Sequence, residues 1–162
     1  MAEPTRSLPL RWGTYRGRYL AGLALIVSGL LCVQGGSAYF GLPLGAGALA
    51  HAAGWWIMPA AGWRRIWSVG PSLIVTFVLL IGPAGVGLLA ISFACWLLVR
   101  HRPAITFLLA LPVLGVGIVI REFLYEYNGM LPALGIMAVV IVGCAWLAFF
   151  ITRSRRPPSI PH

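Results

Sequence analysis

The longest uncharged stretch of the chain runs from Ile66 to Val99, between Arg65 and Arg100. Its 34 residues include no Asp, Glu, Lys, Arg or His, which is the composition of a segment buried in a membrane. As one α-helix it would be about 51 Å long, longer than a whole bilayer of about 40–45 Å. Gly82-Pro83-Ala84-Gly85 interrupts it at its middle, and both proline and glycine favour a turn. We therefore predict two short spans, 66–82 and 84–99, joined by a tight hairpin.

The distribution of arginines supports this hairpin. The chain has twelve arginines and no lysine, and with a turn at Gly82 eleven of the arginines fall on one side of the membrane. Only Arg121 falls on the other side. A single helix over 66–99 would divide them seven to five. Because positive residues collect on the cytoplasmic side, the hairpin and cytoplasmic termini are favoured.

These arguments predict an all-α integral membrane protein with six spans arranged as three helical hairpins. A basic interfacial arm (1–18) precedes the membrane domain (19–151), and a disordered basic tail (152–162) follows it. The arms of the central hairpin are short for membrane-spanning helices. The predicted spans are 19–35, 42–58, 66–82, 84–99, 104–120 and 130–151.

Composition excludes most soluble classes. The chain is 60% hydrophobic and 9% charged, so at 162 residues it could not hide its apolar surface from water. A net charge of +9 would suggest nucleic acid in a soluble domain. Here the arginines stand at span ends, so we expect contacts with anionic lipid headgroups and no nucleic-acid binding. The expected headgroup contacts are Arg64, Arg65, Arg100, Arg102, Arg153, Arg155 and Arg156.

A weak internal repeat accompanies the three hairpins. The second span of each begins near a proline and ends near a tryptophan: Pro43 to Trp56, Pro83 to Trp96, and Pro132 to Trp146. The first two align without gaps at an offset of 40. Either the two-span unit is triplicated, or the three spans have converged on the same favourable chemistry, because proline suits a first helical turn and tryptophan suits the interface.

His51 and Gln34 form the candidate intramembrane polar site. His51 is the only histidine well inside a span, and an ionisable group there is a functional hypothesis by default. The alternative, which we favour, is a structural role for His51 as a neutral histidine with a hydrogen-bond partner. A dyad of Ser37 and His51 is disfavoured because Ser37 lies in an outer turn without a G-x-S-G element. The sequence predicts no metal site and no cofactor, since it lacks C-x-x-C, a nucleotide loop and clustered ligands.

The loop after the fifth span holds the only acidic, aromatic cluster outside the membrane. Glu122 and Glu126 are spaced i, i+4, so a helical extension would place them on one face. They could bind a cation or a partner, or form a solvated loop with Arg121 partly neutralising them. The candidate contact residues are Arg121, Glu122, Tyr125, Glu126 and Tyr127.

No catalytic constellation is present, so we predict a non-enzymatic protein of a bacterial inner membrane. The favoured hypothesis is an accessory or structural subunit that packs against a larger membrane complex or against copies of itself. The alternative is a small oligomeric channel or transporter for an apolar or weakly polar solute, with His51 and Gln34 lining the path. An intramembrane enzyme acting on lipid would need His51 or the Glu122/Glu126 loop for turnover.

Overall fold

The computed structural model describes residues 13–36, 41–124 and 129–154. Within them every regular element is helical, so the prediction of an all-α chain is confirmed. The α-helices are α1 (Tyr15–Gln34), α2 (Leu42–Ile57), α3 (Gly62–Val78), α4 (Leu89–Val99), α5 (Ala110–Phe123) and α6 (Met130–Ser154). Three 3₁₀ segments adjoin them: η2 (Leu79–Ile81) continues α3, η3 (Pro83–Leu88) leads into α4, and η4 (Ala104–Leu109) leads into α5.

In the described ranges, four helical segments are long and apolar enough to cross a membrane, which is what a membrane-embedded protein requires. They are Tyr15–Gln34, Gly62–Ile81, Ala104–Phe123 and Met130–Ser154. Pro83–Val99 is apolar but shorter, and α2 has 16 residues.

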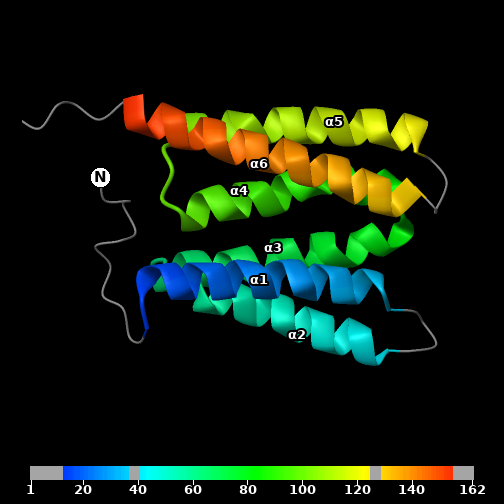
Figure 1. Ribbon diagram of the computed structural model, residues 1–162, viewed down its shortest axis with the longest axis horizontal. Coiled ribbons are helices and arrows are strands. Elements are labelled where there is room, and N and C mark those ends of the chain that lie inside the picture. Colours follow the sequence, from blue (N-terminus) through cyan, green and yellow to red (C-terminus); the bar gives the residue numbers. More distant parts are fainter. Residues whose placement is uncertain (1–12, 37–40, 125–128, 155–162) are drawn as a thin grey trace, which may run out of the picture.

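The helices lie along the long axis of the molecule and alternate in direction (Figure 1). Helices α1, α3 and α5 run one way, and α2, α4 and α6 run the other. The first three form one half of the bundle and the last three form the other. The arginine-rich helix ends therefore share one end of the bundle, and Arg121 lies at the opposite end.

The chain reverses at Gly82, inside the predicted turn. Gly82 has φ +108° and ψ −164°, a backbone conformation that only glycine adopts easily. Its N–H donates to the Leu79 carbonyl at 3.1 Å, and the Gly85 N–H donates to the Gly82 carbonyl at 3.1 Å. These bonds tighten both helix ends into 3₁₀ turns, so the backbone groups freed by the reversal find partners.

The first helix begins earlier than the sequence suggests. Thr14 caps α1, because its Oγ1 accepts from the Gly17 N–H at 3.1 Å, so helix starts at Tyr15 and not at the predicted Tyr19. Four residues assigned to the interfacial arm are therefore helical, and the arm's residues 1–12 lie outside the described ranges. Proline also acts locally, because Pro112 lies in the first turn of α5, where η4 changes to α-helix.

Glycines bring α1 and α2 into backbone contact. A Cβ on Gly29 would lie 2.6 Å from the Gly47 carbonyl oxygen, and a Cβ on Gly54 would lie 2.6 Å from the Gly22 carbonyl oxygen. In the other half, a Cβ on Gly117 of α5 would collide with the Gly87 Cα. Small residues at these points allow the helices to approach closely, which matters where lipid removes the hydrophobic drive between helices.

Positions that align in the predicted repeat lie in different surroundings. Leu49 is 74% exposed, whereas its counterpart Leu89 is 7% exposed. Gly45 faces open space, whereas its counterpart Gly85 is buried. Helix α2 lies at the edge of the bundle and α4 lies at its centre (Figure 1), so triplication remains a prediction.

Candidate functional site

His51 is held in the first half of the bundle by partners from three helices. It is 1% exposed. Its Nδ1 lies 3.1 Å from the Ile26 carbonyl of α1, and its Nε2 lies 2.8 Å from Ser72 Oγ of α3. The Trp55 indole N–H, one turn along α2, donates to the same Nε2 at 3.2 Å. Every polar atom of the ring is therefore engaged, as a buried polar group requires.

These partners assign the tautomer of His51. A carbonyl can only accept, so Nδ1 carries the proton and donates it to Ile26. An indole N–H can only donate, so Nε2 is unprotonated and accepts from Trp55. A proton on Nε2 would face the Trp55 N–H donor to donor. The hydrogen-bond network thus fits a neutral histidine.

Ser72 connects His51 to the second half of the bundle. Its Oγ lies 3.2 Å from Ser92 Oγ of α4, and its carbonyl accepts from Thr76 Oγ1 at 2.9 Å. Ser68, Ser72 and Thr76 recur every four residues along α3, and all three are fully buried. This i, i+4 spacing places them on one helix face, and it is the sequence signal that could have identified Ser72 as the partner of His51.

Gln34, the second predicted site residue, does not contact His51. Its side-chain amide Nε2 donates to the Thr76 carbonyl at 3.2 Å, at the far end of α1. The two predicted residues are therefore linked only through α3, by way of Ser72 and Thr76.

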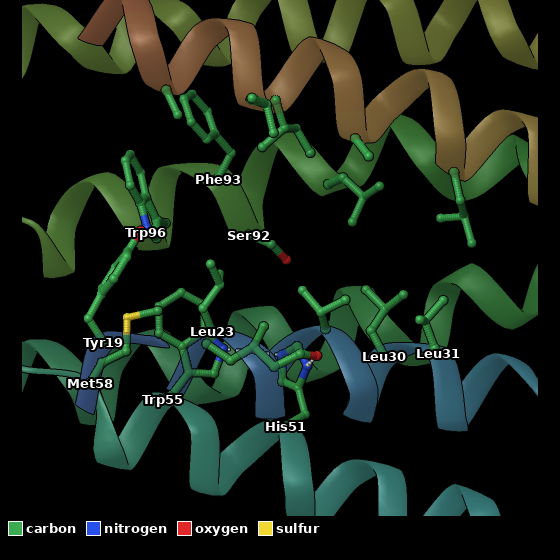
Figure 2. Close-up of a pocket in the computed structure, with 18 residues that line it drawn as sticks. Tyr19, Leu23, Leu30, Leu31, His51, Trp55, Met58, Ser92, Phe93 and Trp96 are labelled. Carbon is green, nitrogen blue, oxygen red and sulfur yellow. Dashed lines mark hydrogen bonds between the residues drawn. The ribbon is translucent and has the colours of Figure 1, made fainter. Parts of the chain in front are cut away.

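An apolar pocket of about 410 Å³ lies beside this cluster, between the two halves of the bundle. Helices α1, α2, α4 and α6 line it, and nearly all of the lining is hydrocarbon or aromatic. Figure 2 shows His51 and Trp55 on one wall and Ser92, Phe93 and Trp96 on the opposite wall. The volume lies within the range of about 300–1,000 Å³ typical of small-molecule sites.

The mouth of the pocket opens between α1 and α6, on the side of the bundle. The lining residues that are also exposed come from these two helices: Val27 and Leu31 of α1, and Ala138 and Val142 of α6. In a membrane this side faces acyl chains, because both helices are long and apolar enough to span one. A molecule could thus enter the pocket from the bilayer interior without crossing water.

Ser72, His51 and the Ile26 carbonyl are arranged in the order of a nucleophile, a base and a group that orients the base. Ser72 is fully buried and does not line the pocket, so a carbonyl substrate has no path to its Oγ. The Trp55 N–H also shares the Nε2 lone pair that a general base would use. Ser37, the serine weighed in the sequence, lies outside the described residues.

The predicted headgroup arginines contact protein groups at the arginine-rich end of the bundle. Arg64 donates to the Leu98 carbonyl at 3.0 Å, and Arg65 donates to the Trp56 carbonyl at 2.9 Å. Arg100 donates to Tyr15 Oη at 2.8 Å. Arg64 and Arg65 thus bond carbonyls in the last turns of α4 and α2. Arg153 lies in the last turn of α6, and Arg155 and Arg156 lie outside the described residues.

A second histidine lies at this end, in the turn after α4. His101 has φ +53°, and its Nε2 is buried without a hydrogen-bond partner. Burial lowers the pKa of His101, and the nearby Arg64 charge lowers it further.

The acidic loop is described only at its start. Arg121 and Glu122 lie exposed in the last turn of α5, so the helix extends past the predicted span end at residue 120. Tyr125, Glu126 and Tyr127 lie outside the described residues, and the predicted contact surface stays a prediction. Among the residues that the structure covers, no three His, Cys, Asp or Glu side chains gather where they could hold a metal ion.

No protein-family model, no curated protein and no solved structure matches the chain.

Proposed function

We propose that the chain is a non-enzymatic membrane transport protein that binds an apolar or weakly polar molecule from the surrounding bilayer. The observation that carries this proposal is the pocket between the two halves. Its walls are mostly apolar, its mouth lies on the side that would face acyl chains, and its lining includes the polar residues His51 and Ser92 on facing walls. An apolar cavity with a few convergent polar groups is the usual form of a small-molecule site.

The membrane topology that goes with this function has six spans and both termini in the cytoplasm of a bacterial plasma membrane. The clustering of arginines at one end of the bundle supports it, because the positive-inside rule assigns that end to the cytoplasm. Helix α2 would be about 24 Å long, shorter than a hydrocarbon core of about 30 Å, so local thinning of the bilayer is part of the proposal.

A pocket-filling substitution tests the proposed function. Ala138→Phe would place an aromatic ring at the mouth, whereas Ala24→Phe makes the same change at an exposed position of α1 that does not line the pocket. We expect native mass spectrometry from lipid nanodiscs to detect a bound small molecule on the wild type and on Ala24→Phe. Ala138→Phe should lose it. Equal retention by both variants would refute binding in this pocket.

An accessory subunit is the second candidate. Gly135 and Gly143 of α6 are exposed, and a Cβ at either position would meet nothing within 4 Å. Their spacing of eight residues puts them on one face, where another helix could approach closely. The same mass spectra distinguish the two functions, because a stoichiometric foreign protein retained by the wild type and by Ala138→Phe alike would favour the subunit.

A further inference from the structure

The proton positions in the His51 cluster indicate which chemistry the pocket can recognise. Nε2 of His51 carries no proton, yet Ser72 Oγ lies only 2.8 Å from it. A contact of this length between two electronegative atoms needs a proton between them, so the Ser72 hydroxyl donates to Nε2. A hydroxyl has one proton. Ser72 therefore has none left for its other neighbour.

Ser92 must then be the donor in its contact with Ser72. The two hydroxyl oxygens are 3.2 Å apart, and by geometry alone either serine could donate to the other. Because the Ser72 proton is engaged at His51 Nε2, the proton between the two serines is that of Ser92. With the protons placed in this way the oxygen of Ser92 keeps its two lone pairs, and in the part of the chain that the structure describes Ser72 is the one hydrogen-bond partner of the Ser92 hydroxyl. Unlike Ser72, Ser92 is partly exposed and lines the pocket. Figure 2 shows its hydroxyl directed into the space across from His51.

The pocket thus presents an acceptor in otherwise apolar surroundings. The chain of bonds from the Ile26 carbonyl through His51 and Ser72 fixes the direction of each donor and ends at Ser92 Oγ. A ligand complementary to it has a donor at one point and hydrocarbon elsewhere. A charged ammonium would lose its hydration in this cavity, and a carboxylate or ketone would bring a second acceptor. A neutral hydroxyl fits.

We propose that the pocket binds a lipid-like alcohol, whose hydroxyl donates to Ser92 Oγ while its hydrocarbon body lies toward α1 and α6. This inference rests on the proposed function, and it adds the chemical class of the ligand and the residue that recognises it. The alcohol enters through the mouth between Val27 and Val142 and stays within the hydrocarbon layer throughout.

The test compares two probes that differ in one group. A diazirine-bearing hexadecanol and the matching diazirine-bearing hexadecane are incubated with the full chain in nanodiscs and photolysed. Labelled peptides then report occupancy of the pocket as probe concentration rises. We expect the alcohol to reach half-maximal labelling at a concentration about threefold to tenfold lower than the hydrocarbon, as one hydrogen bond would give.

Ser92→Ala removes the acceptor and should abolish this preference while leaving the hydrocarbon probe unchanged. Ser92→Thr keeps a hydroxyl and should retain the preference. Ser28→Ala is the matched control, since the Ser28 hydroxyl is exposed and bonds only within α1, to the Leu25 carbonyl.

The outcomes separate the two proposals. A wild type that labels equally well with both probes, or an alcohol preference that survives in Ser92→Ala, would overturn the alcohol assignment and leave pocket binding intact. If neither probe labels pocket peptides above the level of Ala138→Phe, the proposed function fails, and the alcohol assignment fails with it.

Discussion

Helices α1, α2 and α3 are joined by polar side chains, whereas α4, α5 and α6 meet around apolar ones. In the first half, His51 bonds to α1 and α3, and Gln34 bonds to α3. In the second half, the core consists of side chains such as Phe93, Val113 and Met137. Both halves share one device, a glycine contact that brings two helices together. Hydrogen bonds fix the rotation of a helix about its axis, while apolar packing in lipid fixes mainly its distance from a neighbour.

Substitutions at the close glycine contacts between helices should have the largest effects on the free energy of unfolding. Gly47→Ala would place a Cβ 2.7 Å from the Gly29 carbonyl oxygen, so α1 and α2 must separate. We expect a loss of about 1–3 kcal/mol in the free energy of unfolding, measured by detergent titration of the purified protein. The matched control is Gly45→Ala, two residues away on the same helix and facing open space.

The second half has the same pair of positions. Gly117 of α5 meets Gly87, whereas Gly115 faces open space. Gly117→Ala should destabilise by a similar amount, and Gly115→Ala should be neutral or slightly stabilising because alanine favours helix. If Gly47→Ala destabilises and Gly117→Ala does not, a close glycine contact stabilises only the half that is joined by polar side chains.

The polar network should give an intermediate effect. His51→Phe keeps a ring but removes both nitrogens, which leaves the Trp55 N–H without its acceptor. We expect a loss of about 1–2 kcal/mol. Adding Trp55→Phe to His51→Phe should cost less than Trp55→Phe costs alone, and the double-mutant cycle measures this coupling. Strictly additive losses would show that Trp55 and His51 stabilise the fold independently.

The smallest effect concerns the turn that leads from α4 into η4 and α5. Because burial and Arg64 lower the pKa of His101, its ring should titrate below its ordinary value near 6.5 in an NMR pH series. The unfolded chain then binds this proton more readily, so stability is full above pH 6.5 and falls as the pH drops through the folded-state pKa. His101→Asn, which tolerates the positive φ, should flatten this dependence. A His101 ring that titrates above 6.5 would contradict the assignment.

The structure also changes what an alanine substitution at His51 would report. If the chain is a transporter with His51 lining the path, a His51→Ala variant that loses flux while assembly stays intact would point to transport. His51 does line the pocket, but it also holds Ile26, Trp55 and Ser72 in place. A loss of flux in His51→Ala would therefore mix binding with folding, and Ser92 is the cleaner position to change.

The sequence by itself determined the helical class and the reversal at Gly82. Long uncharged runs can satisfy their backbone in lipid only as helices or closed barrels, and glycine with proline allows a turn where a helix would be too long. It also determined which helix ends carry arginines, since those positions follow directly from the order of the segments. These features depend on neighbours along the chain.

The partner of His51 and the pocket were decided only by the tertiary structure. His51 and Ser72 are 21 residues apart, and their contact depends on how α2 and α3 are rotated and how close Gly29 and Gly47 let α1 and α2 approach. Composition cannot reveal these rotations, because almost every face of every helix is apolar. The i, i+4 serines of α3 mark a buried face, but only packing decides that this face meets a histidine on one side and Ser92 on the other.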